Sequence, residues 1–544
     1  MKELTRKAGV LLHPTSFPGG QGIGSLGREA YAFVDFLVAA DQQLWQVLPL
    51  NPTGFGDSPY QSFSAFAGNT LLIDEAQWLD QGLLLSSELN HYLPSNHVDF
   101  GPVVREKNRL HALAYGRFSA KKAPKAYVDF CKAQAHWLDD YALFMALKAQ
   151  VIDARRHHLS GHPDYIDYQA KFGAHMDENA LADHYYGGVW NSWPAPLAKR
   201  EATALADKAK ELHTAIEQEK FLQWTFFAQW GKLKTYANDK GIEIIGDAPI
   251  FVSIDSADVW VNKHLFELDT DNVPTAVAGV PPDYFAENGQ LWGNPLYAWD
   301  AHRTEGFAWW IARMGALLQT VDYVRLDHFR GFESYWSVPY GEQTAINGQW
   351  LPGIGAELFV ALEKSLLKKD ETSLPIIAED LGLITPEVLA LRDQLGLPGM
   401  KVLQFAYGDD SSNAYLPHNY DTSNCVVYTG THDNDTTLGW YQSAGEKEKD
   451  LFRRYLNSSG DNPAYDMLRQ AYASSAKWAI VPLQDLLGQG SETRMNVPGV
   501  GAGNWQYRYQ SHSLSNALAQ ELCYLCKLFA RSSGDTAPTR TDVR

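Results

Sequence analysis

Eight short apolar segments separated by helical patterns constrain the fold of this chain more than any other feature. Each segment is bounded by a polar or glycine-rich turn, and helical patterns with apolar residues three and four apart lie between most of them. Buried strands that alternate with helices indicate a parallel α/β structure, and a count of eight favours a (β/α)8 TIM barrel over an open doubly wound sheet. The segments are AGVLLH (8–13), LWQVLPL (44–50), IEIIGD (242–247), VDYVRLD (321–327), PIIAED (375–380), MKVLQF (400–405), CVVYTGTHD (425–433) and WAIVPLQD (478–485).

The gap between the second and third segments is far longer than an ordinary strand-to-helix connection. Residues 75–215 are rich in helical patterns, so we expect an inserted, mainly helical subdomain between barrel strands two and three. The barrel itself is then expected over residues 1–74 and 216–526. The tail, residues 527–544, has the composition of a disordered end.

Charge and hydropathy exclude several classes of partner. Lys and Arg total 46 against 64 Asp and Glu, which gives a net charge of −18 and argues against nucleic acid and anionic membranes. No segment approaches the ~20 consecutive apolar residues of a transmembrane helix, and the apolar run before Pro14 is too short for a signal peptide. We therefore expect a cytoplasmic protein.

Four of the segments carry an acidic residue at or next to their end in a distinctive context: Asp247 in IIGDAPIFV, Asp327 in VRLDHFRG, Glu379 in IIAEDLG and Asp433 in YTGTHDND. In a TIM barrel, the carboxyl ends of all strands lie at one rim, so these four acids are expected to converge there. Their mutual repulsion makes such a group unfavourable unless a metal ion, an arginine or a reaction requires it.

Three alternatives to acid chemistry can be weighed from the motifs. A catalytic metal is disfavoured because Arg325 and Arg330 are interleaved with the acids, and neither an HExxH motif nor an EF-hand loop is present. The stretch GIGSLG (22–27) matches a dinucleotide fingerprint, but HPTSFPGGQ separates it from the preceding strand, so we interpret the match as accidental. The sequence GxSxG of a serine nucleophile does not occur. We expect no cofactor.

A pair of carboxyl groups, one as nucleophile and one as general acid and base, can cleave a glycosidic bond. Arg325 and Asp327 are two residues apart, so on a strand they point to the same side, and the arginine should keep Asp327 ionised as a nucleophile. Glu379 ends a strongly apolar strand, which should raise its pKa and suit it to general acid/base work. Asp433, between His432 and Asn434, would bind sugar hydroxyls.

With these residues in place, the sequence resembles a known family. GDAPIFV, RLDHFRG, AEDLG and THDND, in this order, resemble the short regions of the α-amylase clan, and more specifically those of the 4-α-glucanotransferases of the amylomaltase and disproportionating-enzyme family, glycoside hydrolase family 77. Longer matches, such as GVLLHPTSFPGGQGIGSLG and GVPPDYFAENGQLWGNPLY, extend the resemblance over about residues 8 to 510.

The resemblance implies the same three catalytic acids and adds a set of glucan contacts. For Tyr60 and Trp292, packing at the barrel mouth is the alternative role, and for Asn496 it is capping a turn. The implied contacts are Tyr60, Asp247, Gln290, Trp292, Arg325, His328, His432 and Asn496.

The reaction implied is transfer of an α-1,4-glucan segment, from malto-oligosaccharides and other α-1,4-glucans, to the 4-hydroxyl of glucose or another acceptor, with retention. The residues alone leave open a hydrolase on the same scaffold and, more remotely, a non-catalytic glucan-binding protein. Transfer requires that water be excluded, and the aromatic-rich loop 279–299, with Tyr284 and Trp292, is expected to cover the site.

One stretch departs from the family pattern. Residues 151–188 are longer and richer in histidine than expected, with His157, His158, His162 and His175. The four histidines could suggest a metal site, but we interpret this stretch as a solvated insertion.

Overall fold

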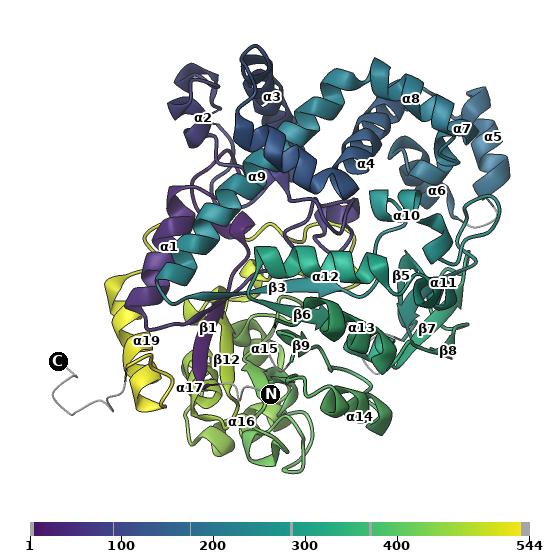
Figure 1. The fold of residues 1–544 in the computed structure, drawn as a ribbon. Coiled ribbons are helices and arrows are strands. Elements are labelled where there is room, and N and C mark those ends of the chain that lie inside the picture. The colour runs from purple at the N-terminus through teal and green to yellow at the C-terminus, as the bar shows by residue number, and fades with distance from the viewer. Residues whose placement is uncertain (1–4, 91, 174–175, 283–286, 369–372, 535–544) are drawn as a thin grey trace.

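The computed structural model describes residues 5–90, 92–173, 176–282, 287–368 and 373–534. All eight apolar segments form strands of one parallel sheet, in the order β10-β11-β12-β1-β2-β3-β6-β9. The amide of Ala378 donates to the carbonyl of Pro398 at 2.9 Å, which brings the two ends of the sheet together and confirms the predicted barrel (Figure 1). The strands are β1 (Lys7–Leu11), β2 (Leu44–Gln46), β3 (Glu243–Pro249), β6 (Tyr323–Asp327), β9 (Ile376–Ala378), β10 (Gly399–Val402), β11 (Cys425–Tyr428) and β12 (Trp478–Pro482).

Helices connect these strands and surround the sheet, as the alternating pattern predicted. Among the described residues, none of the helices is both long enough and apolar enough to cross a membrane. The helices outside the long insertion are α1 (Arg28–Ala39), α10 (Ala257–Val261), α11 (Trp299–Thr304), α12 (Ala308–Thr320), α13 (Ala356–Leu366), α14 (Pro386–Gln394), α15 (Thr437–Ser443), α16 (Glu446–Leu456), α17 (Pro463–Ala473), α18 (Leu483–Leu486) and α19 (Asn516–Leu528).

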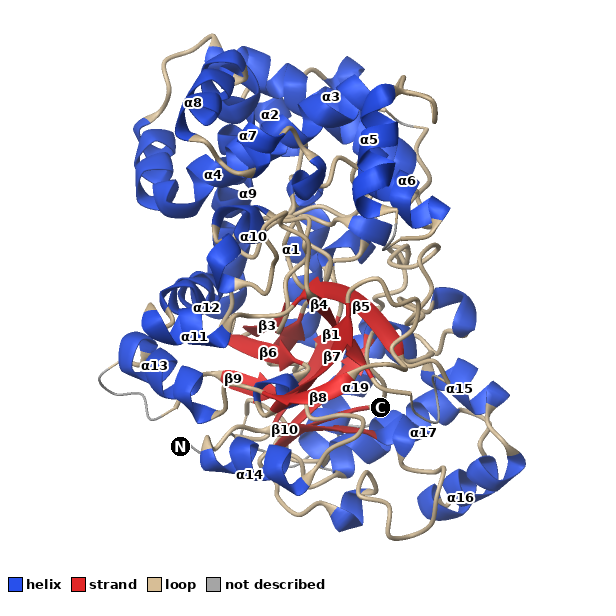
Figure 2. Cartoon of the chain, turned by 90° about the vertical axis from the view of Figure 1, so that its right-hand side faces the viewer, coloured by secondary structure: helices blue, strands red, loops and turns tan. Residues whose placement is uncertain are grey.

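The long connection between β2 and β3 is helical, and Figure 2 shows its helices gathered as a layer at one end of the molecule. The last of them, α9, starts in this layer and continues along the barrel, so it belongs to both parts. The helices are α2 (Ala76–Asp80), α3 (Phe100–Ser119), α4 (Lys125–Arg155), α5 (Pro163–Phe172), α6 (Glu178–Tyr186), α7 (Ala195–Ala198), α8 (Ala202–Glu211) and α9 (His213–Asp239).

Helix α9 joins the inserted helices to the barrel through aromatic side chains. Near its start, the ring of Phe221 lies 4.5 Å from that of Phe118 on α3 and stacks on that of Trp78 at 5.6 Å. Two turns later, the indole of Trp230 donates to the carbonyl of Thr320 at the end of α12 (2.8 Å). The inserted helices therefore share one continuous apolar core with the barrel.

A second, antiparallel sheet stands beside the barrel and was not expected from the sequence. Its strands, in the order β5-β4-β7-β8, are β4 (Ala276–Val280), β5 (Gln290–Pro295), β7 (Ser334–Pro339) and β8 (Gln349–Pro352). The stretch 279–299, expected as a loop, is therefore largely a strand pair. The prediction failed because glycines and prolines interrupt the apolar alternation by which a strand is recognised.

The tail was also predicted incorrectly in part. Arg531, within the segment expected to be disordered, is buried, and its guanidinium donates to backbone carbonyls that include those of Tyr472 (2.8 Å) and Ala476 (2.8 Å). This side chain ties the end of α19 to the region before β12. The ordered chain therefore extends past residue 527, and residues 535–544 lie outside the described part.

Candidate active site

The strand register brings two of the predicted acids side by side. In β6 and β9, Leu326 lies opposite Ala378, and the next residue on each strand is Asp327 and Glu379, respectively. The amide of Glu379 donates to the carbonyl of Leu326 at 3.0 Å, which continues the ladder by one step. Aligned residues on neighbouring parallel strands lie about 4.8 Å apart and share a face, so the two carboxyl groups meet at the carboxyl end of the barrel.

Arg325 is held between two aspartates. It pairs with Asp247 Oδ2 at 2.7 Å across the β3–β6 ladder and with Asp327 Oδ1 at 2.8 Å along its own strand. The hydroxyl of Tyr60 donates to the same oxygen of Asp247 at 2.8 Å. The predicted Arg325–Asp327 ion pair is therefore confirmed, and the structure adds Asp247 as a second partner.

The exposure of these side chains differs within the cluster. The side chains of Arg325 and Asp247 are 4% and 0% exposed, whereas that of Asp327 is 29% exposed. The two covered side chains contact Asp327 and Tyr60, and Oδ1 of Asp247 has no hydrogen-bond partner among the described residues.

Burial raises the pKa values of both neighbouring acids. For Glu379, burial and the charge of Asp327 raise the pKa to about 8. Burial also raises the pKa of Asp327, and Arg325 offsets this effect only in part. Because the cation contacts Asp327 and not Glu379, protonation of Glu379 is favoured over protonation of Asp327.

The backbone fixes the carboxyl group of Glu379. Its Oε2 accepts from the amide of His328 at 2.7 Å, and its Oε1 accepts from the amide of Leu381 at 2.9 Å. His328 has φ of 52°, in the left-handed region that side chains other than glycine rarely adopt. This strained turn directs its amide toward Glu379. A carboxyl group has about four lone-pair positions, so the two bonds still leave room for the catalytic proton.

The ring of His328 faces Trp292 of the second sheet. The two rings lie edge to face at 4.7 Å, and the indole of Trp292 donates to Gln290 Oε1 at 3.1 Å. Burial lowers the pKa of His328 to about 3, so its imidazole is neutral, and its Nε2 has no hydrogen-bond partner among the described residues. Three predicted contacts therefore lie together, and the Nε2 of His328 is a buried ring nitrogen whose hydrogen-bonding capacity is unused in the described part of the chain.

Asp433 is held from two sides in the loop after β11. Its Oδ1 accepts from the amide of the Asn496 side chain at 2.7 Å, and its carbonyl accepts from Arg494 at 2.6 Å. His432 Nε2 lies 3.3 Å from the other carboxylate oxygen. Asn496, predicted as a glucan contact, thus binds Asp433 directly. Arg494 was missed, although it belongs to the same RMNVPG stretch.

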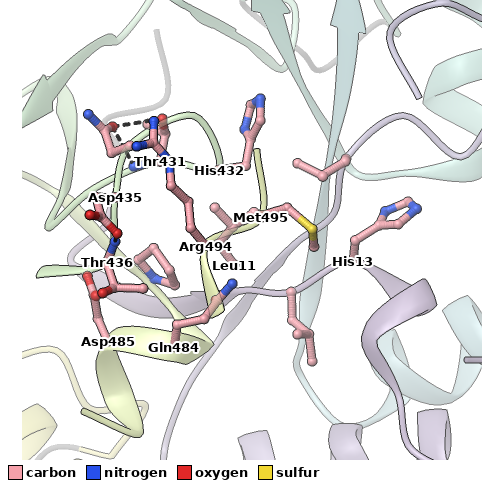
Figure 3. A pocket seen from close by; sticks show the side chains of 14 residues that line it. Leu11, His13, Thr431, His432, Asp435, Thr436, Gln484, Asp485, Arg494 and Met495 are labelled. Atoms are coloured by element: carbon pink, nitrogen blue, oxygen red, sulfur yellow. Dashed lines mark hydrogen bonds between the residues drawn. The ribbon is translucent and has the colours of Figure 1, made fainter. Parts of the chain in front are cut away.

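A small cavity of about 20 Å³ lies beneath this loop (Figure 3). It can hold about one water molecule but not a sugar ring. Buried Asp485 accepts from the hydroxyls of Thr429 (2.5 Å) and Thr437 (2.6 Å), which anchor both ends of the loop. The cavity therefore belongs to the support of Asp433 rather than to the glucan cleft.

An aromatic cluster lies next to Asp433. The ring of Tyr60 stacks on that of His432 at 5.1 Å and 13°, and the indole of Trp505 lies 5.9 Å from Tyr60 and 6.0 Å from His432. Trp505 was not predicted as a site residue. The sequence feature that could have indicated this role is the motif GNWQYR, which contains Trp505 and follows two glycine-rich turns near the C-terminal end of the barrel.

A divalent metal ion has no place between these acids. The guanidinium of Arg325 already fills the space between Asp247 and Asp327, and a cation beside a divalent ion is unfavourable. In the described ranges, the cluster of histidine and acidic residues that could hold a metal lies on the long insertion, at His158, His162 and Asp164.

The barrel and this pair of acids, one contacted by an arginine and one holding a proton, define an enzyme that cleaves and forms glycosidic bonds. Comparison with known proteins identifies the family. A family model for the 4-alpha-glucanotransferases, glycoside hydrolase family 77, matches residues 12–515, and the chain belongs to this family.

Individual members of this family are similar to this chain over almost its whole length. The 4-alpha-glucanotransferase of Synechocystis is 45% identical over 97% of this chain and 98% of its own, and that of Thermus thermophilus is 47% identical over 94% and 96%. The structure of the amylomaltase from Streptococcus agalactiae superposes with a TM-score of 0.86 at 38% identity, covering 97% of this chain and all of that one. The activity is therefore transfer of a 1,4-α-D-glucan segment to the 4-hydroxyl of an acceptor, and not the alternative hydrolysis.

Proposed function

We propose that Asp327 is the nucleophile, Glu379 the general acid and base, and Asp433 the group that binds sugar hydroxyls in the transition state. The observation that carries this assignment is the register of β6 and β9. It places a carboxylate paired with Arg325 beside a carboxyl group whose pKa is about 8. The two acids thus differ in protonation before any substrate binds, as a double displacement requires.

The two half-reactions follow from this difference. Glu379 donates its proton to the glycosidic oxygen while Asp327 attacks the anomeric carbon, so the C–O bond breaks and a glucosyl ester forms. Glu379, now ionised, takes the proton from the 4-hydroxyl of the acceptor as that oxygen attacks the same carbon and releases Asp327. Two inversions give net retention, and the acid is returned to its protonated form.

The groups around the acids supply binding surface for the glucan. The half-buried ring of Tyr60, stacked on His432 and close to Trp505, provides an aromatic surface beside Asp433. The amylomaltase of S. agalactiae was solved in complex with acarbose, which supports glucan binding by the same fold. We assign malto-oligosaccharides and other α-1,4-glucans as donors and glucose as an acceptor.

Transfer also requires that water be kept from the ester intermediate. Trp292, on β5 and against the ring of His328, is in a position to cover the site. Tyr284, proposed for the same role from the sequence, lies outside the described residues. The site needs no cofactor or metal for the chemistry described.

The cellular setting follows from bulk properties. The four cysteines are all free, as is usual in a reducing compartment, and the net charge of −18 disfavours nucleic acid and anionic membrane surfaces. We place the enzyme in the cytoplasm, acting on dissolved glucans.

The test is to incubate the purified protein with maltotriose alone and to follow products and reducing ends over time. Longer oligosaccharides together with glucose, at constant reducing ends, are expected. Trp292→Ala should raise the share of hydrolysis, whereas Leu291→Ala, on the opposite face of β5, should not. Rising reducing ends in the wild-type protein would contradict the proposal, and an unchanged ratio in Trp292→Ala would contradict the role of that residue.

A further inference from the structure

Residues 151–188 supply most of a small apolar cluster that also includes Val273. Tyr165, Tyr168 and Phe172 of α5 pack against Leu181 and Tyr185 of α6, apart from the main core. The turn that leads from α4 into α5 crosses this unit, and three of the four histidines noted in the sequence, His157, His158 and His162, lie in it.

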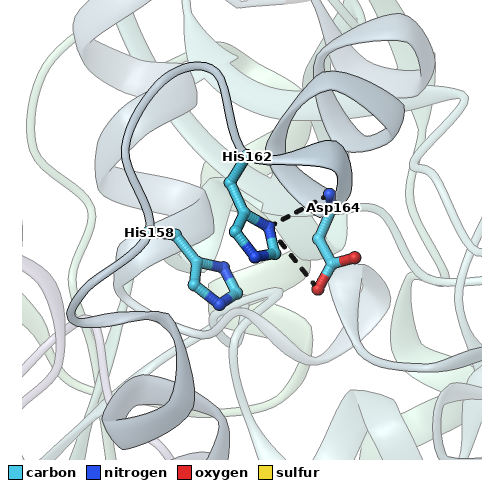
Figure 4. Close-up of side chains that lie close together, drawn as sticks. All are labelled: His158, His162 and Asp164. Carbon is cyan, nitrogen blue, oxygen red and sulfur yellow. Dashed lines mark hydrogen bonds and ion pairs between the residues drawn. The ribbon is translucent and has the colours of Figure 1, made fainter.

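Three metal-ligating side chains meet at this turn (Figure 4). The imidazole rings of His158 and His162 are stacked, with centroids 3.5 Å apart and planes 8° from parallel. The Oδ2 of Asp164 lies 3.9 Å from His162 Nδ1, and one potential ligand atom from each of the three residues lies within 4.8 Å of the others. The side chains of His162 and Asp164 are 37% and 69% exposed, so an ion can reach them from solvent.

His158 is held in the way that metal-binding histidines usually are. Its Nδ1 shares a 2.8 Å hydrogen bond with the hydroxyl of Tyr185, which is buried, and its carbonyl accepts from Tyr186 at 2.9 Å. A hydrogen bond at one ring nitrogen fixes the orientation of the ring and leaves the other nitrogen, Nε2, for a metal. The ring is therefore anchored to α6 rather than free on the surface.

The neighbouring cations are already engaged. Arg155 donates to the carbonyl of Tyr185 at 2.8 Å and stacks on its ring at 4.1 Å, and Arg156 pairs with Asp153 at 2.8 Å. Two imidazole rings and one carboxyl group, without a free cation among these neighbours, form a donor set that suits zinc and similar divalent transition ions better than magnesium or calcium.

We propose that His158, His162 and Asp164 form a binding site for a divalent transition metal ion of the zinc class, outside the catalytic barrel. Three protein ligands leave further positions on the ion for water. A metal ion lies in the plane of each ring that binds it, so the stacked rings must tilt apart on binding. The ion then links the turn after α4 to the first turn of α5 and stabilises the packing of α5 against α6.

The test is calorimetric titration of the full-length protein with zinc chloride. One ion per chain is expected, with affinity at least about tenfold weaker in His158→Ala, His162→Ala and Asp164→Asn. The matched control is His157→Ala, which removes an exposed histidine next to the cluster. Tyr185→Phe, which keeps the aromatic packing but removes the hydrogen bond to His158, should weaken binding by roughly tenfold.

Two further measurements separate this site from other sources of zinc binding. With cobalt in place of zinc, an intense near-ultraviolet thiolate band would place the ion at a cysteine and overturn the proposal. The proposal would also be overturned if the double variant His158→Ala/His162→Ala bound zinc as tightly as the wild-type protein, or if the wild-type protein bound no zinc. Each variant should retain wild-type disproportionation of maltotriose, which shows that it is folded.

Discussion

Replacing Glu379 by glutamine should stabilise the protein while it abolishes transfer. Burial and the charge of Asp327 raise the pKa of Glu379 from 4.5 to about 8. At pH 7 the native protein therefore holds a proton that the unfolded chain has released. Since each tenfold difference in proton affinity corresponds to about 1.4 kcal/mol, this costs the native state up to about 3 kcal/mol at pH 7 and below about 1 kcal/mol at pH 5.

Glutamine removes this cost because it is neutral at every pH, but it also removes a hydrogen bond. Its amide nitrogen cannot accept from a backbone amide, so the bond from either His328 or Leu381 is lost, at about 1 kcal/mol. The side chain is also partly exposed, which reduces the effect of burial. We expect a net gain of about 1–2 kcal/mol at pH 7 and of about zero at pH 5.

The assay is urea denaturation followed by tryptophan fluorescence, for the wild-type and variant proteins at pH 5, 7 and 8.5. The stability of the wild-type protein relative to the variant should fall as pH rises from 4.5 to 8 and then level off, which is the sign expected for a carboxyl group with a raised pKa. Glu178→Gln, at an exposed position of α6, is the control and should show no such pH dependence. If the difference in unfolding free energy between the wild-type protein and Glu379→Gln were the same at all three pH values, the inference that Glu379 holds a proton would be refuted.

Three further predictions concern the same site. The transfer rate should fall as pH rises through about 8, because Glu379 must be protonated to act as an acid; glucose release from maltotriose measures this, and a constant rate to pH 9 would contradict it. Asn496→Ala removes the 2.7 Å donor to Asp433 and should lower kcat roughly 10- to 100-fold with little change in KM, whereas a change in KM alone would indicate ground-state binding. Tyr60→Phe removes one of the two donors to Oδ2 of buried Asp247, while Arg325 still donates to that oxygen, and should cost about 1 kcal/mol in urea denaturation; unchanged stability would contradict a stabilising role of this hydroxyl.

The strands and helices that depend on a pattern of neighbouring residues could be predicted from the sequence. Each barrel strand is a run of apolar residues that ends in a polar turn, so its place depends on neighbouring residues alone. The acids Asp327 and Glu379 follow from the same signal, because parallel strands end at a common rim. The antiparallel sheet was missed because β4 and β5 are interrupted by glycine and proline, and their pairing, rather than their composition, makes them strands.

The sequence by itself thus determined the barrel, the acids at its rim and the family to which they point. Only the tertiary structure decided how the acids are held: Tyr60 donates to Asp247 across 187 positions of sequence, and Asn496 to Asp433 across 63. It also decided that Arg531 is buried and that His158 and His162 stack. The physical reason is that burial and hydrogen bonding depend on which distant segments come into contact, and a local pattern of residues does not determine those contacts.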